Sequence, residues 1–253
     1  MNGWITPDWP TPKRIHAASS TRQLPGCSQP PFERCNLADH VGDQPAALAS
    51  NRAALGAQWQ LPSEPRWLHQ VHGKAVWMAS AGDRASAEPP TADASVSRDA
   101  GVVLAILTAD CLPILLGAQD GNEVAAIHAG WRGLAAGVIE ATVARMQTPP
   151  SRLLAWLGPA IGPKAFVVGD EVRLAMMAVD AAAVAAFSKM DDARGSAPKW
   201  LCDLYLLARQ RLGMVGVDAV YGGGLCTYSD ADRFYSYRRQ TPTGRMASLI
   251  WMG

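Results

Sequence analysis

The hydrophobic positions of the chain gather in short continuous runs more often than in alternating patterns. The most apolar runs, residues 102–107, 112–116 and 124–127, are each bounded by turn residues. Runs of this length are typical of strands that are buried on both faces. We therefore expect these three segments to lie inside a sheet. Shorter runs predict further strands at 153–157, 219–222 and 247–251.

Helix-forming sequence separates many of these runs. Apolar residues recur at helical spacing in residues 46–58, and residues 170–187 are rich in Ala and Met. The chain predicts helices at 46–58, 133–146, 170–187 and 199–212, an extended segment at 67–78, and strands, turns and loops at 1–45 and 80–92. Because hairpins accompany the interspersed strands and helices, a mixed sheet is favoured over a purely parallel one. The expected fold class is mixed α/β (α+β), a single-domain layered sandwich with helices flanking the sheet, over residues 1–253.

A hairpin signal fixes the relative position of two reactive side chains. Asp120-Gly121 lies between two apolar runs, and Asp-Gly is typical of a two-residue type I′ turn. With this turn as the centre, His128 pairs with Pro113. Side chains alternate along a strand, so Cys111 and His128 become diagonal neighbours on one face, roughly 7 Å apart.

Composition excludes several classes of protein. The chain has 253 residues, a formal net charge of +1 and 18% charged residues, so it lacks the basic excess of a nucleic-acid binder. The longest apolar stretch, 101–117, is interrupted by Asp110 and Pro113 and is too short to cross a membrane. The five cysteines are dispersed without a CxxC pair, and the first ten residues show no signal-peptide pattern. We expect a cytoplasmic protein without a disulfide framework, a membrane span or a nucleic-acid partner.

Three side chains form a candidate metal site. Two of the five histidines, His72 and His128, lie beside glycines at predicted strand ends, and Cys111 precedes the run at 112–116. A thiolate with two imidazoles suits zinc or copper, and three ligands leave a fourth position open for water or substrate. The alternative is a buried cysteine and satisfied strand-end histidines. His69 would point to the opposite face of an extended segment from His72, so it is left out as a ligand.

Two further segments favour anion binding. The turn at 128–133 contains two glycines and leads into a helix, and Arg132 adds donors suited to phosphate. Trp131 could stack on a flat substrate or belong to the core. The segment 234–245 carries two tyrosines and the arginines Arg238, Arg239 and Arg245. If it returns to the same cleft, it adds a second anion-binding and aromatic surface; otherwise it is a solvated edge.

These motifs resemble those of the laccase-domain family, also called polyphenol oxidoreductase or peptidoglycan-editing-factor proteins. The matching segments are 70–73, 108–115, 126–133, 157–162, 234–239 and 244–250. The resemblance implies an α/β sandwich with a metal, usually zinc, at His72, Cys111 and His128. It also implies phosphorolysis of adenosine, inosine and methylthioadenosine, and deamination of adenosine; bacterial relatives are further linked to correcting peptidoglycan precursors. The chain departs from the family at Thr21–Ser28, so no substrate contact is carried over to this loop.

The leading hypothesis is a zinc-dependent purine nucleoside enzyme. Zinc at the three ligands would act as a Lewis acid, with Asp110 or Asp93 as the proton-transfer group. Arg132, Arg238, Arg239 and the helix start after Gly130 would hold phosphate, and Trp131 the base.

Three alternatives remain open. In the first, Cys111 is a thiolate nucleophile that pairs with His128 or His72 in an amide hydrolase acting on peptidoglycan precursors. In the second, a single copper serves a polyphenol oxidoreductase, since five histidines are too few for a laccase's trinuclear cluster and blue-copper centre together. In the third, the cleft binds an effector without turnover. The sequence specifies no oligomeric state.

Overall fold

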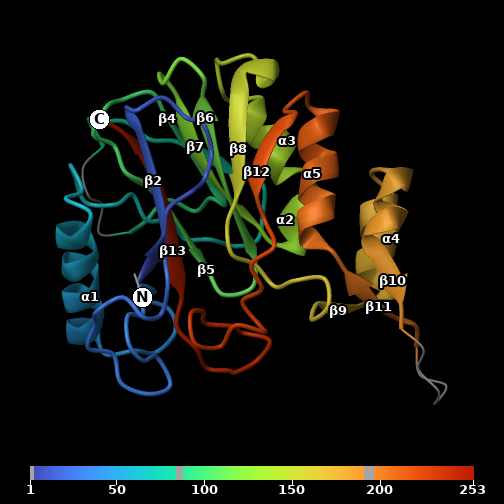
Figure 1. Ribbon diagram of the computed structural model, residues 1–253, viewed down its shortest axis with the longest axis horizontal. Helices are drawn as coiled ribbons and strands as arrows, with labels where there is room; N and C mark the ends of the chain where they lie inside the picture. The colour runs from blue at the N-terminus through green and yellow to red at the C-terminus, as the bar shows by residue number, and fades with distance from the viewer. Residues whose placement is uncertain (1–2, 84–87, 191–196) are drawn as a thin grey trace.

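The strands of the protein form three sheets in a computed structural model that describes residues 3–83, 88–190 and 197–253 (Figure 1). A four-stranded antiparallel sheet has the order β1 (Trp4–Ile5), β2 (Ile15–Ser20), β13 (Met246–Met252) and β5 (Leu104–Thr108). A six-stranded mixed sheet has the order β12 (Ala219–Gly222), β8 (Leu153–Leu157), β6 (Leu112–Ala118), β7 (Val124–Ala129), β4 (Ala94–Ser97) and β3 (Val76–Met78). A small sheet has the order β10 (Phe187–Lys189), β11 (Lys199–Cys202) and β9 (Val167–Gly169).

Helices cover the outer faces of the two larger sheets. The α-helices are α1 (Pro45–Gln58), α2 (Trp131–Ala136), α3 (Val138–Val143), α4 (Asp170–Met177) and α5 (Leu204–Met214), and the 3₁₀ helices are η1 (Pro150–Arg152) and η2 (Ala181–Ala186). Helix α1 lies over the four-stranded sheet, and α2, α3 and α5 lie over the six-stranded sheet (Figure 1). Helix α4 and η2 pack with the small sheet at one side of the molecule. The result is the predicted mixed α/β sandwich with flanking helices.

The continuous apolar runs occupy strands that are buried on both faces. On β5, Leu104 and Ile106 point into the core between the two large sheets, while Ala105 and Leu107 point into the core beneath α1. Burial of each large aliphatic side chain stabilises the folded state by about 1.5–3 kcal/mol. The run is apolar throughout because neither face of the strand meets water.

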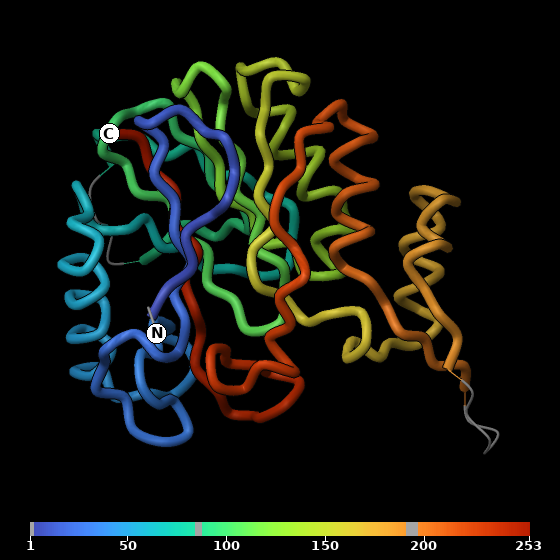
Figure 2. Tube along the Cα trace, in the orientation of Figure 1, coloured from blue at the N-terminus to red at the C-terminus, as the bar shows by residue number. Residues whose placement is uncertain are grey.

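The last strand of the chain, β13, pairs with a strand from the N-terminal part of the chain. β13 lies between β2 and β5, so the C-terminal strand is beside an N-terminal one (Figure 2). Met246 on β13 pairs with Thr108 on β5. This register brings the segment that precedes β13 to the turn that carries Cys111.

Three predicted elements need correction. The helix predicted at 133–146 is divided into α2 and α3 by Gly137, which has φ of 90° and ends α2. The helix predicted at 170–187 ends near Ala178, and Asp180 starts η2 by accepting a hydrogen bond from the backbone N–H of Ala182. The helix predicted at 199–212 begins at Leu204, capped by Asp203, because residues 199–202 pair with β9 as strand β11.

Two further segments differ from expectation. The predicted extended segment at 67–78 is regular strand only at β3, and β4, which follows Asp93, was not predicted. Part of the predicted loop at 80–92, residues 84–87, lies outside the described residues.

The hairpin between β6 and β7 has the predicted register and a different turn. Pro113 pairs with His128, as expected. The connection is a longer loop in which the N–H of Gly121 donates to the carbonyl of Ala118, and only Gly121 of the Asp120-Gly121 pair has positive φ. The type I′ turn was therefore wrong, but the centre of the loop, and so the pairing, is the same.

Candidate metal centre

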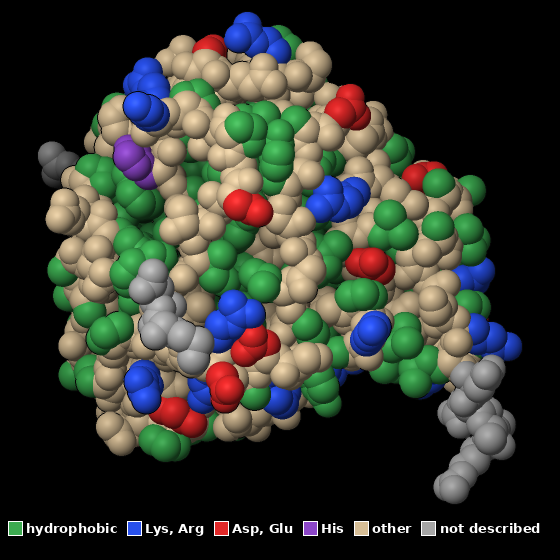
Figure 3. Space-filling view, in the orientation of Figure 1, with side chains coloured by type: hydrophobic (Ala, Val, Ile, Leu, Met, Phe, Trp, Pro, Cys, Tyr) green, Lys and Arg blue, Asp and Glu red, His purple; other side chains and the backbone are tan. Residues whose placement is uncertain are grey.

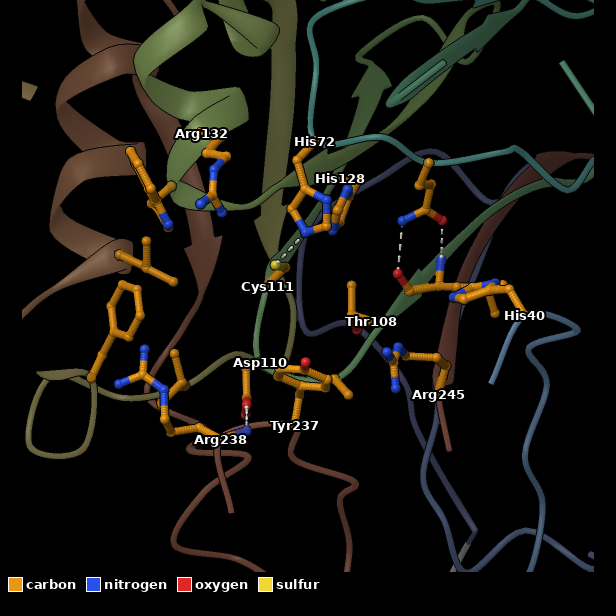
Figure 4. A pocket seen from close by; sticks show the side chains of 17 residues that line it. His40, His72, Thr108, Asp110, Cys111, His128, Arg132, Tyr237, Arg238 and Arg245 are labelled. Atoms are coloured by element: carbon orange, nitrogen blue, oxygen red, sulfur yellow. Dashed lines mark hydrogen bonds between the residues drawn. The ribbon is translucent and has the colours of Figure 1, made fainter. Parts of the chain in front are cut away.

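Three side chains from distant parts of the chain meet at one end of the six-stranded sheet. His128 lies near the end of β7, Cys111 immediately precedes β6, and His72 occupies the turn before β3. One ligand atom from each lies within 4.8 Å of the other two. Sγ of Cys111 is 3.7 Å from Nε2 of His72, and the two imidazole rings have centroids 4.8 Å apart (Figure 4). The predicted convergence of these three residues is present in the structure.

A buried carboxylate holds two of these ligands in place. Oδ1 of Asp93 accepts hydrogen bonds from Nδ1 of His128 and from the backbone N–H of His72, each at 2.8 Å. Oδ2 accepts from the backbone N–H groups of Gly73 at 2.6 Å and Val71 at 3.2 Å. The contact with Nδ1 leaves Nε2 of His128 as the free ring nitrogen. The backbone contacts fix the turn at His72, whose φ of 60° is unusual for a residue with a side chain.

The charges of the centre stabilise one another. Burial alone would raise the pKa of the Cys111 thiol, but His128 and His72 lower that pKa to about 6. Burial opposes protonation of His128, yet Cys111 and Asp93 raise its pKa to about 9. Hydrogen bonds from His128 and Gly73 outweigh burial and lower the pKa of Asp93. In the metal-free protein the arrangement thus favours a thiolate beside an imidazolium.

A missing side chain keeps space beside the sulfur. A Cβ atom placed on Gly130 would lie 2.9 Å from Sγ of Cys111 and 3.0 Å from Cδ2 of His72. Atoms at these distances would clash with the Cβ atom. Glycine is therefore required at this position for the ligands to adopt the observed geometry.

The three ligands border a pocket of about 400 Å³, a size suited to a small organic ligand. Arg132 and Arg238 lie on one side of the ligand group, and His40 and Arg245 lie on the other (Figure 4). The aromatic side chains of the lining are Trp131, Phe166 and Tyr237. Of the two alternatives left open for the C-terminal segment, the structure shows a return to the cleft for Tyr237, Arg238 and Arg245.

Asp110 is the single acidic residue of the described pocket lining. Its backbone has φ of 93°. Its Oδ1 accepts a hydrogen bond from the hydroxyl of Thr227 and its Oδ2 accepts one from the backbone N–H of Arg238, each at 2.6 Å. Asp110 thus ties the Cys111 turn to the C-terminal segment. The side chain of Arg238 donates to the carbonyl of Val167 and lies over the ring of Phe166.

Other candidate residues lie elsewhere. Arg239 is absent from the pocket lining, because its guanidinium donates to the carbonyl oxygens of Thr227, Tyr228 and Phe234. The departing loop at 21–28 is also outside the lining. Arg132 and Trp131 do line the pocket, and the guanidinium lies over the indole at 4.5 Å.

Three contributions were not identified from the sequence. Asp93 was considered for proton transfer, whereas it holds His128 and the turn at His72. Gln70 belonged to a matching motif without a role; its side chain exchanges two 2.8 Å hydrogen bonds with the backbone of Leu107. His40 gave no signal at all. For Gln70, its place three residues before the turn glycine Gly73 is the one signal in the sequence; Asp93 has no glycine near it in the sequence.

Residues 16–253 match the family described as multi-copper polyphenol oxidoreductase laccase. The chain belongs to this family. Among its relatives, purine nucleoside phosphorylase YfiH of Escherichia coli K12 is 53% identical over 252 residues, which cover 100% of both chains. A purine nucleoside phosphorylase of Pseudomonas aeruginosa is 51% identical over 255 residues, covering 100% of this chain and 99% of the other.

Solved structures of family members have the same fold. The crystal structure of a Neisseria meningitidis protein matches with a TM-score of 0.90 and 45% identity, covering 99% of each chain. YlmD from Geobacillus stearothermophilus matches with a TM-score of 0.87 and 29% identity, covering 99% of this chain and 96% of the other.

The described residues of this chain offer too few metal ligands for the several coppers that the family's name mentions. His72, Cys111 and His128 form the one potential metal-binding group among the described residues. Of the other histidines, His16 stacks on Trp251 and His40 contacts Asp39. A trinuclear copper cluster with a separate blue-copper centre needs more ligands than this group supplies. The geometry fits a single ion.

In the described part of the chain, no helix combines the length and apolar character needed to cross a bilayer.

Proposed function

We propose that this protein is a zinc-dependent purine nucleoside phosphorylase that acts on adenosine, inosine and methylthioadenosine and also deaminates adenosine. The observation that carries the proposal is the position of the His72–Cys111–His128 group, in the wall of a pocket of about 400 Å³ with Arg132 and Arg238 beside it. The names of the relatives support the same reaction class. The arginines offer donors for the phosphate that phosphorolysis consumes, and the metal-binding group beside them could polarise a polar atom of the substrate.

The donor set fits zinc. Zinc in proteins binds thiolate sulfur and imidazole nitrogen, and three protein ligands leave a position for a reactant. The Cys111 thiol has a lowered pKa, and His128 presents Nε2 while Nδ1 is bonded to Asp93. When bound, the metal supplies Lewis-acid chemistry to a polar atom of the substrate or to water. His72, Cys111 and His128 would hold it, and Asp93 would orient two of them.

The arginines beside the ligands would bind inorganic phosphate. Arg132 and Arg238 are exposed to the pocket and form no ion pair with a carboxylate among the described residues. Guanidinium groups bind phosphate through paired N–H donors. Helix α2 has only six residues, so its N-terminus contributes less to anion binding than the predicted longer helix would. We therefore assign phosphate binding to the two side chains and exclude Arg239.

The remaining lining would position the nucleoside. Trp131, Phe166 and Tyr237 offer flat faces for a purine ring. We assign Asp110 to positioning, because each of its oxygens already accepts a hydrogen bond, from Thr227 and from Arg238. Asp93 is buried behind His128 and takes no part in the lining.

A second candidate function is favoured by the lowered pKa of Cys111. A thiolate beside an imidazolium is the arrangement of a cysteine nucleophile, which would act on an amide such as that of a peptidoglycan precursor. The two functions differ in the need for a metal. A chelator abolishes the phosphorylase and leaves the amide hydrolase active, whereas an alkylating reagent inactivates a hydrolase that contains no zinc.

Metal content and product identity test the proposal together. Purified protein is analysed for zinc and copper, then incubated with adenosine and phosphate, and the products are separated by chromatography. We expect about one zinc per chain, adenine with ribose 1-phosphate from phosphorolysis, and inosine from deamination. Phenol oxidation by copper-loaded protein, without any nucleoside product, would instead support the polyphenol oxidoreductase.

Two cysteine variants make the test specific. Cys111→Ala should lose stoichiometric zinc and reduce nucleoside turnover by about a thousandfold or more. Cys27→Ala is the matched control, because Cys27 is exposed and lies outside the pocket lining. Full turnover by Cys111→Ala would refute the proposed centre.

A further inference from the structure

Positive charge lines both ends of the pocket, although the chain as a whole is nearly neutral. The formal net charge is +1, and basic and acidic side chains are interspersed on the face shown in Figure 3. Inside the pocket, three arginines face one carboxylate, that of Asp110. Both oxygens of that carboxylate are occupied by Thr227 and Arg238. This concentration of charge indicates an anionic ligand.

The arginines are divided between two places. Arg132 and Arg238 lie on one side of Cys111, and Arg245 lies on the other with His40 (Figure 4). In this view Cys111, Asp110 and Tyr237 lie between the two places, so we assign a separate anion to each. If phosphate binds at Arg132 and Arg238, Arg245 still has no carboxylate within ion-pair distance among the described residues, and the charges of Cys111 and Asp110 act on it from farther away.

Arg245 is held rigidly and keeps free donors. Its backbone N–H donates to Asn36, and Nη1 donates to the carbonyl oxygens of Thr243 and Gly244. Among the described residues, none offers an acceptor to Nε or Nη2, and no carboxylate forms an ion pair with this side chain. The guanidinium is half-buried, with its carbon 5.7 Å from the ring centroid of Tyr237. A fixed, partly desolvated guanidinium with open donors is suited to a second phosphate.

We infer that the pocket also takes nucleosides that carry a 5′-phosphate, with Arg245 binding that phosphate; this rests on the proposed phosphorolysis. In a β-nucleoside the attacking phosphate approaches C1′ from the face opposite the base, whereas the 5′-carbon lies on the same face as the base. The two phosphates therefore lie at separate ends of the ligand, as the arginines lie at separate ends of the pocket.

The reaction of adenosine 5′-monophosphate (AMP) balances without another reactant. An oxygen of hydrogen phosphate forms a bond to C1′ while the C1′–N9 bond breaks. The electron pair of that bond leaves with the purine, which gains the proton that hydrogen phosphate loses. The products are adenine and ribose 1,5-bisphosphate.

The experiment compares AMP with adenosine as substrates of the zinc-loaded protein. Adenine is measured by chromatography and ribose 1,5-bisphosphate by phosphorus NMR. We expect kcat/KM for AMP to equal or exceed that for adenosine. Arg245→Gln should lower the ratio of the two kcat/KM values about tenfold to a hundredfold, as expected for loss of a hydrogen-bonded charge pair. Arg245→Lys should restore part of the ratio.

Calorimetric titration of the same proteins in metal-free form with AMP and with adenosine, without phosphate, gives a second readout, because neither phosphorolysis nor metal-dependent deamination then consumes the ligand. Wild-type protein should bind AMP more tightly than adenosine, and Arg245→Gln should lose that difference. Arg145→Gln is the matched control, because Arg145 is exposed and outside the pocket lining. Arg245→Lys keeps the test valid if Arg245→Gln does not fold.

Three outcomes would overturn the inference. Turnover of adenosine without binding or turnover of AMP would do so and leave the proposed function intact. An equal loss for both substrates in Arg245→Gln would show that Arg245 serves the whole site instead of a 5′-phosphate. Absence of both turnovers would refute the phosphorylase itself and the AMP reaction with it, and the titration would then show whether AMP alone is bound.

Discussion

The two sides of the pocket are built in different ways. The ligand side, His72, Cys111 and His128, is fixed by a buried carboxylate, by the paired strands β6 and β7, and by backbone groups. The arginine side comprises the long side chains that flank these ligands, Arg132 and Arg238 at one end of the pocket and Arg245 at the other; they lie on a short helix and on the segment before β13. The first side has one geometry, because Asp93 and the strands β6 and β7 that hold it are buried. On the second side, Arg132 and Arg238 are exposed and can adapt to a ligand, whereas Arg245 is held by two backbone carbonyl oxygens and keeps free donors.

This difference suits the two sides to different tasks: holding a metal in a fixed geometry and binding a substrate. Catalytic groups need accurate placement, and rigid strands supply it. Substrate recognition tolerates side chains that move, provided that their charge stays near the ligand. Substitutions on the ligand side should therefore change metal binding and folding together, whereas substitutions on the arginine side should change substrate affinity alone.

The largest effect should come from Asp93→Asn. An amide in place of the carboxylate removes the charge that faces His128 and presents N–H groups to backbone donors. We expect zinc affinity to fall about tenfold to a hundredfold and the free energy of unfolding to fall by about 2–4 kcal/mol. Competition with a chromophoric chelator measures the first change, and urea unfolding of the metal-free protein measures the second. Unchanged zinc affinity would show that the ligands hold their geometry without Asp93.

A smaller effect concerns the reactivity of Cys111 in metal-free protein. Because its pKa is lowered to about 6 from the ordinary thiol value of 9.0, the thiolate persists as the pH falls to 6. At pH 7 we expect iodoacetamide to alkylate Cys111 about tenfold faster than an ordinary thiol, with half-maximal rate near pH 6. Mass spectrometry of the labelled peptides gives the rate for each cysteine, and the exposed Cys27 serves as the internal reference. Zinc should protect Cys111; equal labelling with and without zinc would place the metal elsewhere.

The smallest effect separates two arginines that are close in kind but differ in position. Arg132→Gln should raise KM for phosphate about fivefold to tenfold without changing stability, because its guanidinium lies in the pocket. Arg239→Gln should leave KM for phosphate nearly unchanged and lower the free energy of unfolding by about 1–3 kcal/mol, because three carbonyl oxygens lose their donor. Steady-state kinetics and thermal unfolding of both variants give the comparison. The reverse pattern would exchange the roles of the two arginines.

The ligand side could be predicted from the sequence because strand geometry is periodic. The centre of the loop at Asp120-Gly121 determines which residue faces His128, and this pairing survived the change of turn type. The buried strands could also be predicted, because a short run that is apolar throughout is typical of a strand with both faces buried.

The arginine side could not be predicted in the same way. Arg238 and Arg239 are neighbours in the chain, yet one faces the pocket and the other binds three carbonyl oxygens. Their directions depend on a loop anchored by Asp110 and Thr227, which no periodic pattern describes. Strand β11 was missed for a related reason. Residues 199–202 directly precede helix α5, so the predicted helix was extended over them, whereas their pairing with β9 makes them a strand.

One added methyl group at position 130 would displace the ligands of the centre. Any side chain at position 130 would place a carbon against both the sulfur of Cys111 and the ring of His72. The residue without a side chain thus sets the spacing of the ligands on either side of it. The same position offers a way to silence the protein in a living cell while every ligand of the centre remains in the chain.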